Sequence, residues 1–138
     1  LGAGGAARGV AHALKLAGAR ISLANRTAPK AVAVAEELGI AAVSWDTMPL
    51  AQIDLLVNCT TVGLATDDSP ISVAGLGKGC AVFDAVYRKG DTRLVRDALA
   101  RGLVTVSGEA MLLHQGARAF ALWTGKRAPI DIMREALR

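Results

Sequence analysis

The sequence Gly2-Ala3-Gly4-Gly5-Ala6-Ala7-Arg8 has the form G-x-G-x-x-G/A, with Ala7 in the third position. Gly2 permits a tight turn out of a strand, and Gly4 lets the backbone approach a bound pyrophosphate. The small side chain of Ala7 lets the following helix pack close to a sheet. A phosphate would lie at the helix N-terminus, where free N–H groups and the helix dipole favour an anion. We predict a nucleotide-phosphate site at residues 2–7, although short Gly/Ala strings also occur in ordinary tight turns.

The end of the next predicted strand distinguishes between two nucleotides. Residues 20–25 read as a strand ending in Asn25-Arg26-Thr27, about 20 residues after the glycines, where such a fold meets the adenosine ribose. An NAD site needs Asp or Glu here, and no acid stands nearby. A guanidinium matches a 2′-phosphate, and Lys30 would add a second positive charge. The pattern predicts NADP(H), with Arg26 and Lys30 beside its 2′-phosphate; the alternative for Arg26 in isolation is a solvated loop arginine.

Composition agrees with helices packed closely on a sheet. The 138 residues suffice for one domain, and 52% hydrophobic but only 4% aromatic residues imply a core of Ala, Val, Leu and Ile. The net charge of +4 is scattered, which argues against a nucleic-acid partner. We expect no membrane span, no metal site and a cytoplasmic location, since Cys59 and Cys80 lack metal or redox spacing and read as buried free thiols.

Helix-like and strand-like segments alternate along the chain. Helices are predicted at 6–17, between Thr27 and Gly39, and at 91–101, 109–123 and 129–137; strands are predicted at 20–25, 40–43, 54–58, 80–86 and 103–106. This alternation predicts one α/β domain over residues 1–138, a doubly wound Rossmann-type fold with a mostly parallel sheet and helices on both faces. Such a sheet needs a buried strand before its Gly-rich turn, and only Leu1 stands there. We therefore expect the first strand to be largely missing, and residues of a longer protein to precede Leu1.

Two polar side chains are candidates for contacts with a substrate. Tyr87, the only tyrosine, follows a predicted strand and can donate a hydrogen bond; an ordinary half-buried ring is the alternative. Gln115 lies among apolar residues of a long helix, so its amide needs a partner, either a substrate hydroxyl or backbone. No arrangement for hydride-coupled proton transfer is evident, so we predict no catalytic residue within this chain.

Several motifs, in order, closely resemble the C-terminal half of shikimate dehydrogenases. They are the glycine turn, Asn25-Arg26-Thr27 with Lys30, Asn58-Cys59-Thr60-Thr61-Val62-Gly63-Leu64, Asp84-Ala85-Val86-Tyr87, and Gly108 to Gln115 followed by Phe120 and Trp123-Thr124-Gly125. Leu64 replaces the Met usual in that family. The resemblance implies NADPH-dependent reduction of 3-dehydroshikimate to shikimate, in the biosynthesis of chorismate and the aromatic amino acids.

The resemblance also implies residue roles and a partner domain. Tyr87 and Gln115 would touch the substrate. Asn25 and Thr27 would join Arg26 and Lys30 around the NADP phosphate, and the cofactor would further contact Thr60, Ala85, Gly108 and Met111, with Ala85 and Gly108 against the nicotinamide. The family's catalytic Lys and Asp lie in an N-terminal domain without a counterpart here, so this chain alone is expected to be inactive. A fusion with dehydroquinate dehydratase, a relative acting on quinate, a non-catalytic NADP-binding module and a homodimer are the alternatives left open.

Overall fold

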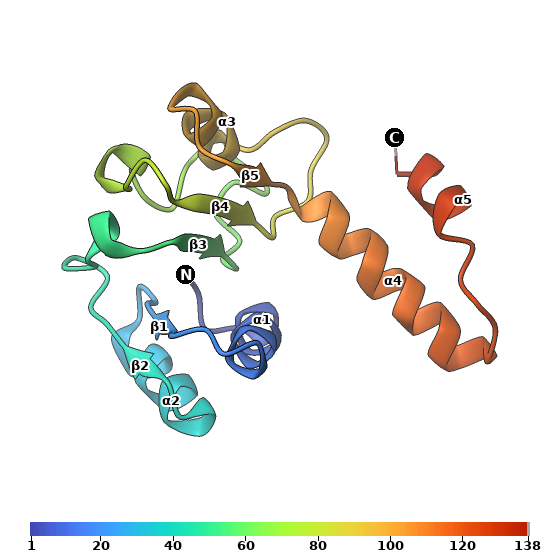
Figure 1. The fold of residues 1–138 in the computed structure, drawn as a ribbon, viewed down its shortest axis with the longest axis horizontal. Coiled ribbons are helices and arrows are strands. Elements are labelled where there is room, and N and C mark those ends of the chain that lie inside the picture. Colours follow the sequence, from blue (N-terminus) through green and yellow to red (C-terminus); the bar gives the residue numbers. More distant parts are fainter. Residues whose placement is uncertain (138) are drawn as a thin grey trace.

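The computed structural model describes residues 1–137 as parallel strands flanked by helices (Figure 1). The strands are β1 (Ser22–Leu23), β2 (Ala41–Ala42), β3 (Leu55–Asn58), β4 (Ala81–Asp84) and β5 (Thr105–Val106). The helices are α1 (Gly5–Leu16), α2 (Ala28–Leu38), α3 (Arg93–Ala100), α4 (Gly108–Thr124) and α5 (Ile130–Glu135), with short 3₁₀ turns η1 (Leu50–Gln52) and η2 (Val73–Gly75). All strand pairs among the described residues are parallel, which confirms the predicted fold class.

The strands form two groups with the start of the chain between them. β1 pairs with β2, and β3, β4 and β5 pair in that order. The Leu1 nitrogen donates to the Val57 carbonyl at 2.6 Å, and the Leu1 carbonyl accepts from the Cys59 N–H at 2.9 Å. The Gly2 N–H donates to the Ala24 carbonyl at 2.8 Å. Residues 1–2 therefore bridge β1 and β3, and the N-terminus lies between these strands in Figure 1.

Two apolar clusters hold the helices against the strands. The smaller one joins α1 and α2 to β1 through Ala7, Leu23, Ala31 and Val34. The larger one surrounds β3 and β4 and contains Leu56, Val73, Leu76, Cys80, Val82, Leu94, Ala98 and Leu103. Small residues at the helix surfaces allow close approach, as predicted for Ala7, which is 3% exposed.

The inward-facing surfaces of the first two helices are narrow. Ala13, Ala17 and Val32 are exposed, although apolar residues at helical spacing usually face a sheet. In α1 the buried residues are Ala7 and Ala11, one helical turn apart. The helix presents this narrow small-residue stripe inward, because only small side chains let it approach both β1 and α2.

Helices α4 and α5 lie to one side of the strands and pack against each other (Figure 1). Large apolar side chains near the far end of this pair face solvent, including Trp123 at 85% exposure and Leu122 at 80%. None of the helices within residues 1–137 combines the length and apolarity needed to cross a membrane.

The N-terminal end of α4 lies against the backbone that follows β4. A Cβ atom at Gly108 would lie 2.4 Å from the Val86 carbonyl oxygen and 2.6 Å from the Ala85 carbonyl oxygen. These distances are shorter than any tolerable contact, so only glycine permits α4 to begin at this place.

We predict that Gly108→Ala destabilises the chain. Overpacking against two carbonyls should lower the free energy of unfolding by about 1–3 kcal/mol, despite the roughly 1 kcal/mol by which Ala favours a helix over Gly. Gly9→Ala in α1 is the matched control, because a Cβ there would meet nothing within 4 Å. Urea denaturation should show Gly9→Ala unchanged or more stable; similar stabilities for the two variants would contradict the close approach at Gly108.

Candidate functional site

The carboxyl ends of the parallel strands lie at one edge, and backbone contacts link them from strand to strand. Gly2, bonded to Ala24 just before Asn25, has a φ of +101°, and a Cβ there would lie 2.9 Å from the Cys59 carbonyl oxygen. The Ala85 N–H donates to the Asn58 carbonyl at 2.8 Å. With the contact of Ala85 on Gly108, this series brings the segments carrying most of the predicted cofactor residues to one edge.

The first turn of α1 leaves backbone N–H groups accessible. Gly4 stands at the N-cap with an extended backbone, no side chain caps the helix, and no acid lies in the first turn. Gly4, Gly5 and Ala6 are exposed. The unpaired N–H groups and the positive end of the helix dipole make this turn suited to an anion.

Two exposed cations stand beside the end of β1. The Asn25 side chain donates to the Thr27 carbonyl at 3.0 Å and so braces the turn that carries Arg26. Lys30 lies in the first turn of α2, which contains no acid, although the dipole favours a negative charge there. None of the ion pairs found in residues 1–137 involves Arg26 or Lys30. This corner therefore carries uncompensated positive charge at a place that attracts anions.

A buried carboxylate ties together β3, β4 and α3. Asp84 is fully buried and accepts from the Asn58 amide at 2.9 Å, the Val86 N–H at 3.0 Å and the Thr92 hydroxyl at 2.6 Å. Thr92 in turn accepts from the Val95 N–H at 3.3 Å and so caps α3. The backbone after β4, which carries Ala85 and Tyr87, is held by this group.

The same network shapes the loop after β3. Asn58 is fully buried, and its side-chain oxygen accepts from the Thr60 N–H at 3.0 Å and the Thr60 hydroxyl at 2.7 Å. The Thr60 hydroxyl oxygen accepts from the Val62 N–H at 3.2 Å. These three hydrogen bonds fix the conformation of the turn that contains Thr60, one of the predicted cofactor residues.

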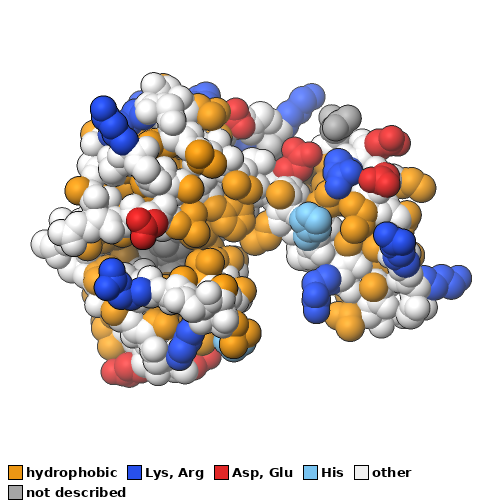
Figure 2. Space-filling view, viewed as in Figure 1, with side chains coloured by type: hydrophobic (Ala, Val, Ile, Leu, Met, Phe, Trp, Pro, Cys, Tyr) orange, Lys and Arg blue, Asp and Glu red, His pale blue; other side chains and the backbone are white. Residues whose placement is uncertain are grey.

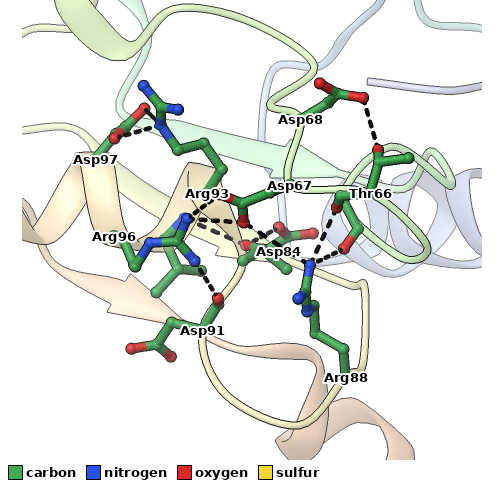
Figure 3. Close-up of polar contacts among 12 residues, drawn as sticks. Thr66, Asp67, Asp68, Asp84, Arg88, Asp91, Arg93, Arg96 and Asp97 are labelled. Carbon is green, nitrogen blue, oxygen red and sulfur yellow. Dashed lines mark hydrogen bonds and ion pairs between the residues drawn. The ribbon is translucent and has the colours of Figure 1, made fainter.

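Charged residues outside the predicted site fasten this loop (Figure 3). Arg88 donates to the carbonyls of Gly63 at 3.1 Å and Thr66 at 3.0 Å, and Arg96 donates to Asp67 at 2.6 Å. These hydrogen bonds from Arg96 hold the pKa of Asp67 below its usual value. Any stability that this exposed pair adds is present above the ordinary Asp pKa and is lost as pH falls through the lowered value.

Sequence reasoning did not find this contact between Arg88, Arg96 and the loop. The only sequence feature that points to this contact is the group of arginines at positions 88, 93 and 96. That feature is not specific, because the sequence does not indicate that the loop folds back toward them.

The two predicted substrate residues make contacts within the chain. The Tyr87 ring is 37% exposed, and its hydroxyl donates to the Leu137 carbonyl at 3.4 Å. The Gln115 amide donates to the Leu112 carbonyl at 3.1 Å, which is the backbone partner named as one of its two alternatives. No hydrogen bond within residues 1–137 joins Tyr87 to Gln115. A cavity of about 100 Å³ opens beside Tyr87. Met111, which is a predicted cofactor contact, lies one turn into α4 and is half-buried.

The cysteines and histidines do not form a reactive centre in the part of the chain that the structure describes. No three His, Cys, Asp or Glu side chains within residues 1–137 are grouped as metal ligands. Burial raises the pKa of the Cys59 and Cys80 thiols, so both stay protonated at neutral pH. Cys80 is buried as predicted, whereas Cys59 is only half-buried, because it lies at the open edge beside Leu1.

We predict that Asp84→Ala strongly destabilises the chain. Three buried donors would lose their acceptor, which should lower the free energy of unfolding by about 3 kcal/mol or more. Asp131→Ala serves as the control, since the Asp131 side chain is 93% exposed and bonds only Arg134 in the next turn; we expect a change within about 0.5 kcal/mol. Equal midpoints for the two variants in urea denaturation would show that the network contributes nothing.

Comparison with known proteins relates this arrangement to one family. Residues 108–138 match the family described as "Shikimate 5'-dehydrogenase C-terminal domain". A curated shikimate dehydrogenase (NADP(+)) of Halobacterium salinarum is 49% identical over 141 residues, which cover 100% of this chain and 53% of that protein.

Solved structures give the same result. The shikimate 5-dehydrogenase of Thermus thermophilus, in complex with NADP(H) and shikimate, matches with a TM-score of 0.89 and 44% identity over 99% of this chain and 52% of the other. A quinate dehydrogenase from Corynebacterium glutamicum, in complex with NAD, matches with a TM-score of 0.90 and 32% identity, covering 97% of this chain and 51% of the other. The chain spans about half the length of these relatives, and by sequence and fold it belongs to the shikimate dehydrogenase family.

Proposed function

We propose that this chain is the NADP(H)-binding domain of an enzyme that reduces 3-dehydroshikimate to shikimate. The observation that carries the proposal is the pair of exposed cations, Arg26 and Lys30, at the carboxyl end of β1. The open first turn of α1 follows Gly2, which is hydrogen-bonded to the residue before Asn25. One anion site for a pyrophosphate and a second for an extra phosphate thus lie on neighbouring segments.

The chemistry of the two sites favours NADP(H) over NAD(H). Arg26 presents a planar fork of donors that suits a phosphate, whereas a ribose 2′-hydroxyl would call for a carboxylate acceptor. Lys30 adds charge where the α2 dipole is already positive, a combination that a phosphate dianion would relieve. The Thermus thermophilus relative was solved with NADP(H) bound, which supports this assignment.

The remaining predicted residues would position the nicotinamide and the substrate. Gly108 and the Ala85 carbonyl are in contact at the edge of the sheet, so a nicotinamide ring there would lie on bare backbone. Thr60 and Met111 flank the same edge, and the Tyr87 hydroxyl and the Gln115 amide are the substrate contacts that we propose. When bound, the cofactor would supply a hydride, for which this chain provides the binding surface and the orientation.

The proton-transfer groups would come from a second domain. The chain covers about half of its relatives' length, so we propose that an N-terminal domain carries the catalytic Lys and Asp and shares the substrate with this one. On this proposal the 138-residue chain binds the cofactor but does not turn over substrate. A place in aromatic amino acid biosynthesis and a cytoplasmic location follow from the same proposal, and the free cysteines Cys59 and Cys80 agree with a reducing compartment.

Quinate is the alternative substrate with specific support. The Corynebacterium glutamicum quinate dehydrogenase has nearly the same fold over this chain, and it was solved with NAD. Steady-state kinetics of the full-length protein with shikimate and with quinate, each with NADP⁺ and NAD⁺, would separate the alternatives. A higher kcat/KM for quinate, or for NAD⁺, would contradict our proposal.

We predict that Arg26→Ala weakens NADPH binding and leaves NADH binding nearly unchanged. Loss of a charge-assisted hydrogen bond to the 2′-phosphate should cost about 1.5–3 kcal/mol, which is roughly a ten- to hundredfold increase in Kd. Isothermal titration calorimetry with both nucleotides measures the difference.

Arg20→Ala is the matched control for this experiment. Arg20 precedes β1 and is exposed like Arg26, but it lies at the opposite end of the same strand. The Arg20→Ala substitution removes the same charge as Arg26→Ala, so an effect of net charge alone on nucleotide affinity would appear in both variants. Equal losses of NADPH and NADH affinity in Arg26→Ala would exclude the selective role.

A further inference from the structure

Two exposed loops follow β3 and β4. The carboxyl ends of these strands point toward the hollow between the strands and the arm formed by α4 and α5, as Figure 1 and Figure 2 show. Residues 64–68 of the first loop are all exposed, and so are four of residues 87–91 in the second, in which Arg88 is partly buried. Segments with so little apolar burial open easily unless polar contacts hold them. The order of both loops therefore depends on hydrogen bonds.

Arg88 joins the two loops. One nitrogen of its guanidinium donates to the Gly63 carbonyl at 3.1 Å and to the Thr66 carbonyl at 3.0 Å. The same nitrogen lies 3.9 Å from the Asp67 carboxylate. In Figure 3 the Arg88 side chain extends from its own loop toward Thr66 and Asp67. A single side chain of the second loop thus holds the first loop at three successive acceptors.

The second loop is fixed at its two ends by the buried carboxylate. The Val86 N–H and the Thr92 hydroxyl both donate to Asp84, at 3.0 Å and 2.6 Å. Between these ends, the Tyr87 hydroxyl makes a hydrogen bond of 3.4 Å, which is long for a hydroxyl donor and holds the ring weakly. The strong contacts in the middle of this loop are those of Arg88, the next residue along the backbone.

We propose that Arg88 is a positioning residue, which fixes the backbone of Tyr87 by tying it to the loop after β3. It would thereby set the place where the Tyr87 hydroxyl meets the substrate. This inference rests on the proposed function, in which Tyr87 contacts the substrate. The turn at Thr60 is held by Asn58 instead, so cofactor affinity should not depend on Arg88.

The kinetic test uses the full-length protein that contains this chain. Arg88→Met keeps an unbranched stem but removes the donors, and Arg93→Met is the matched control, because Arg93 pairs with Asp97 within its own helix. We expect Arg88→Met to raise the KM for shikimate about tenfold at nearly unchanged kcat, since a misplaced hydroxyl weakens ground-state and transition-state binding alike. NADPH affinity should stay unchanged in both variants.

Arg88→Lys distinguishes positioning from a general need for folding. Its ammonium retains charge and donors, so the KM for shikimate should return part of the way toward that of the unsubstituted protein. A purely structural loss would instead reduce the fraction of active enzyme, which lowers the apparent kcat and leaves KM as it was.

Hydrogen exchange tests the contact between the loops without substrate. The Leu64 amide donates to the Thr61 carbonyl at 3.1 Å, directly after the carbonyl of Gly63 that Arg88 binds. In Arg88→Met this amide should exchange about tenfold faster. The Val82 amide in β4 is the internal reference, and Arg93→Met should leave both amides unchanged.

Three results would overturn the proposal. The KM for shikimate could be the same in Arg88→Met and Arg93→Met. The Kd for NADPH could rise as much as the KM, which would show that Arg88 acts on the cofactor. Unchanged exchange at Leu64 would show that Arg88 does not order the loop. Inactivity of the unsubstituted protein toward shikimate would contradict the proposed function itself, and the role of Tyr87 would fall with it, whatever the exchange measurement shows.

Discussion

The position of the proposed site depends on one buried carboxylate. Asp84 accepts three hydrogen bonds away from solvent, and each donor comes from a different segment: the end of β3, the backbone after β4 and the cap of α3. A carboxylate in such a place is tolerated only because its donors are provided by the fold. The carboxylate in turn holds these three segments together, at the point where the strand ends lead into the loops of the proposed site.

Close backbone contacts at Gly2 and Gly108 also determine the geometry of this edge of the sheet. At Gly2 and Gly108 the absent side chain brings a turn or a helix against carbonyl oxygens of a neighbouring strand end. The two glycines serve different purposes: Gly2 has a left-handed φ and lies against the loop after β3, whereas Gly108 lets a long helix begin against the end of β4. Together they produce an edge made largely of bare backbone, which a flat ring or a phosphate can approach closely.

Much of this architecture could be predicted from the sequence. Alternating apolar segments and glycine stops gave the order of helices and strands, and the spacing from Gly2 to Arg26 gave the nucleotide prediction. Periodicity failed in α1, where Ala7 and Ala11 are buried and Ala13 is not, because alanines do not indicate which face is inward. Asp84 was noticed only as part of a motif, and no pattern indicates that Asn58 and Thr92, far apart in the chain, donate to it. The contact of Arg96 with Asp67 depends on a loop whose path has no periodic signal.

The tight seat of Gly108 has a consequence for the arm formed by α4 and α5. Helix α4 has 17 residues and so reaches about 25 Å from its fixed end. Over that length, a tilt of the helix by about 10° at Gly108 would displace its far end by about 4 Å. The exposed Trp123 and Leu122 lie near that far end. The positions of these two side chains are therefore set at the other end of the helix, where Gly108 lies against the carbonyl oxygens of Ala85 and Val86.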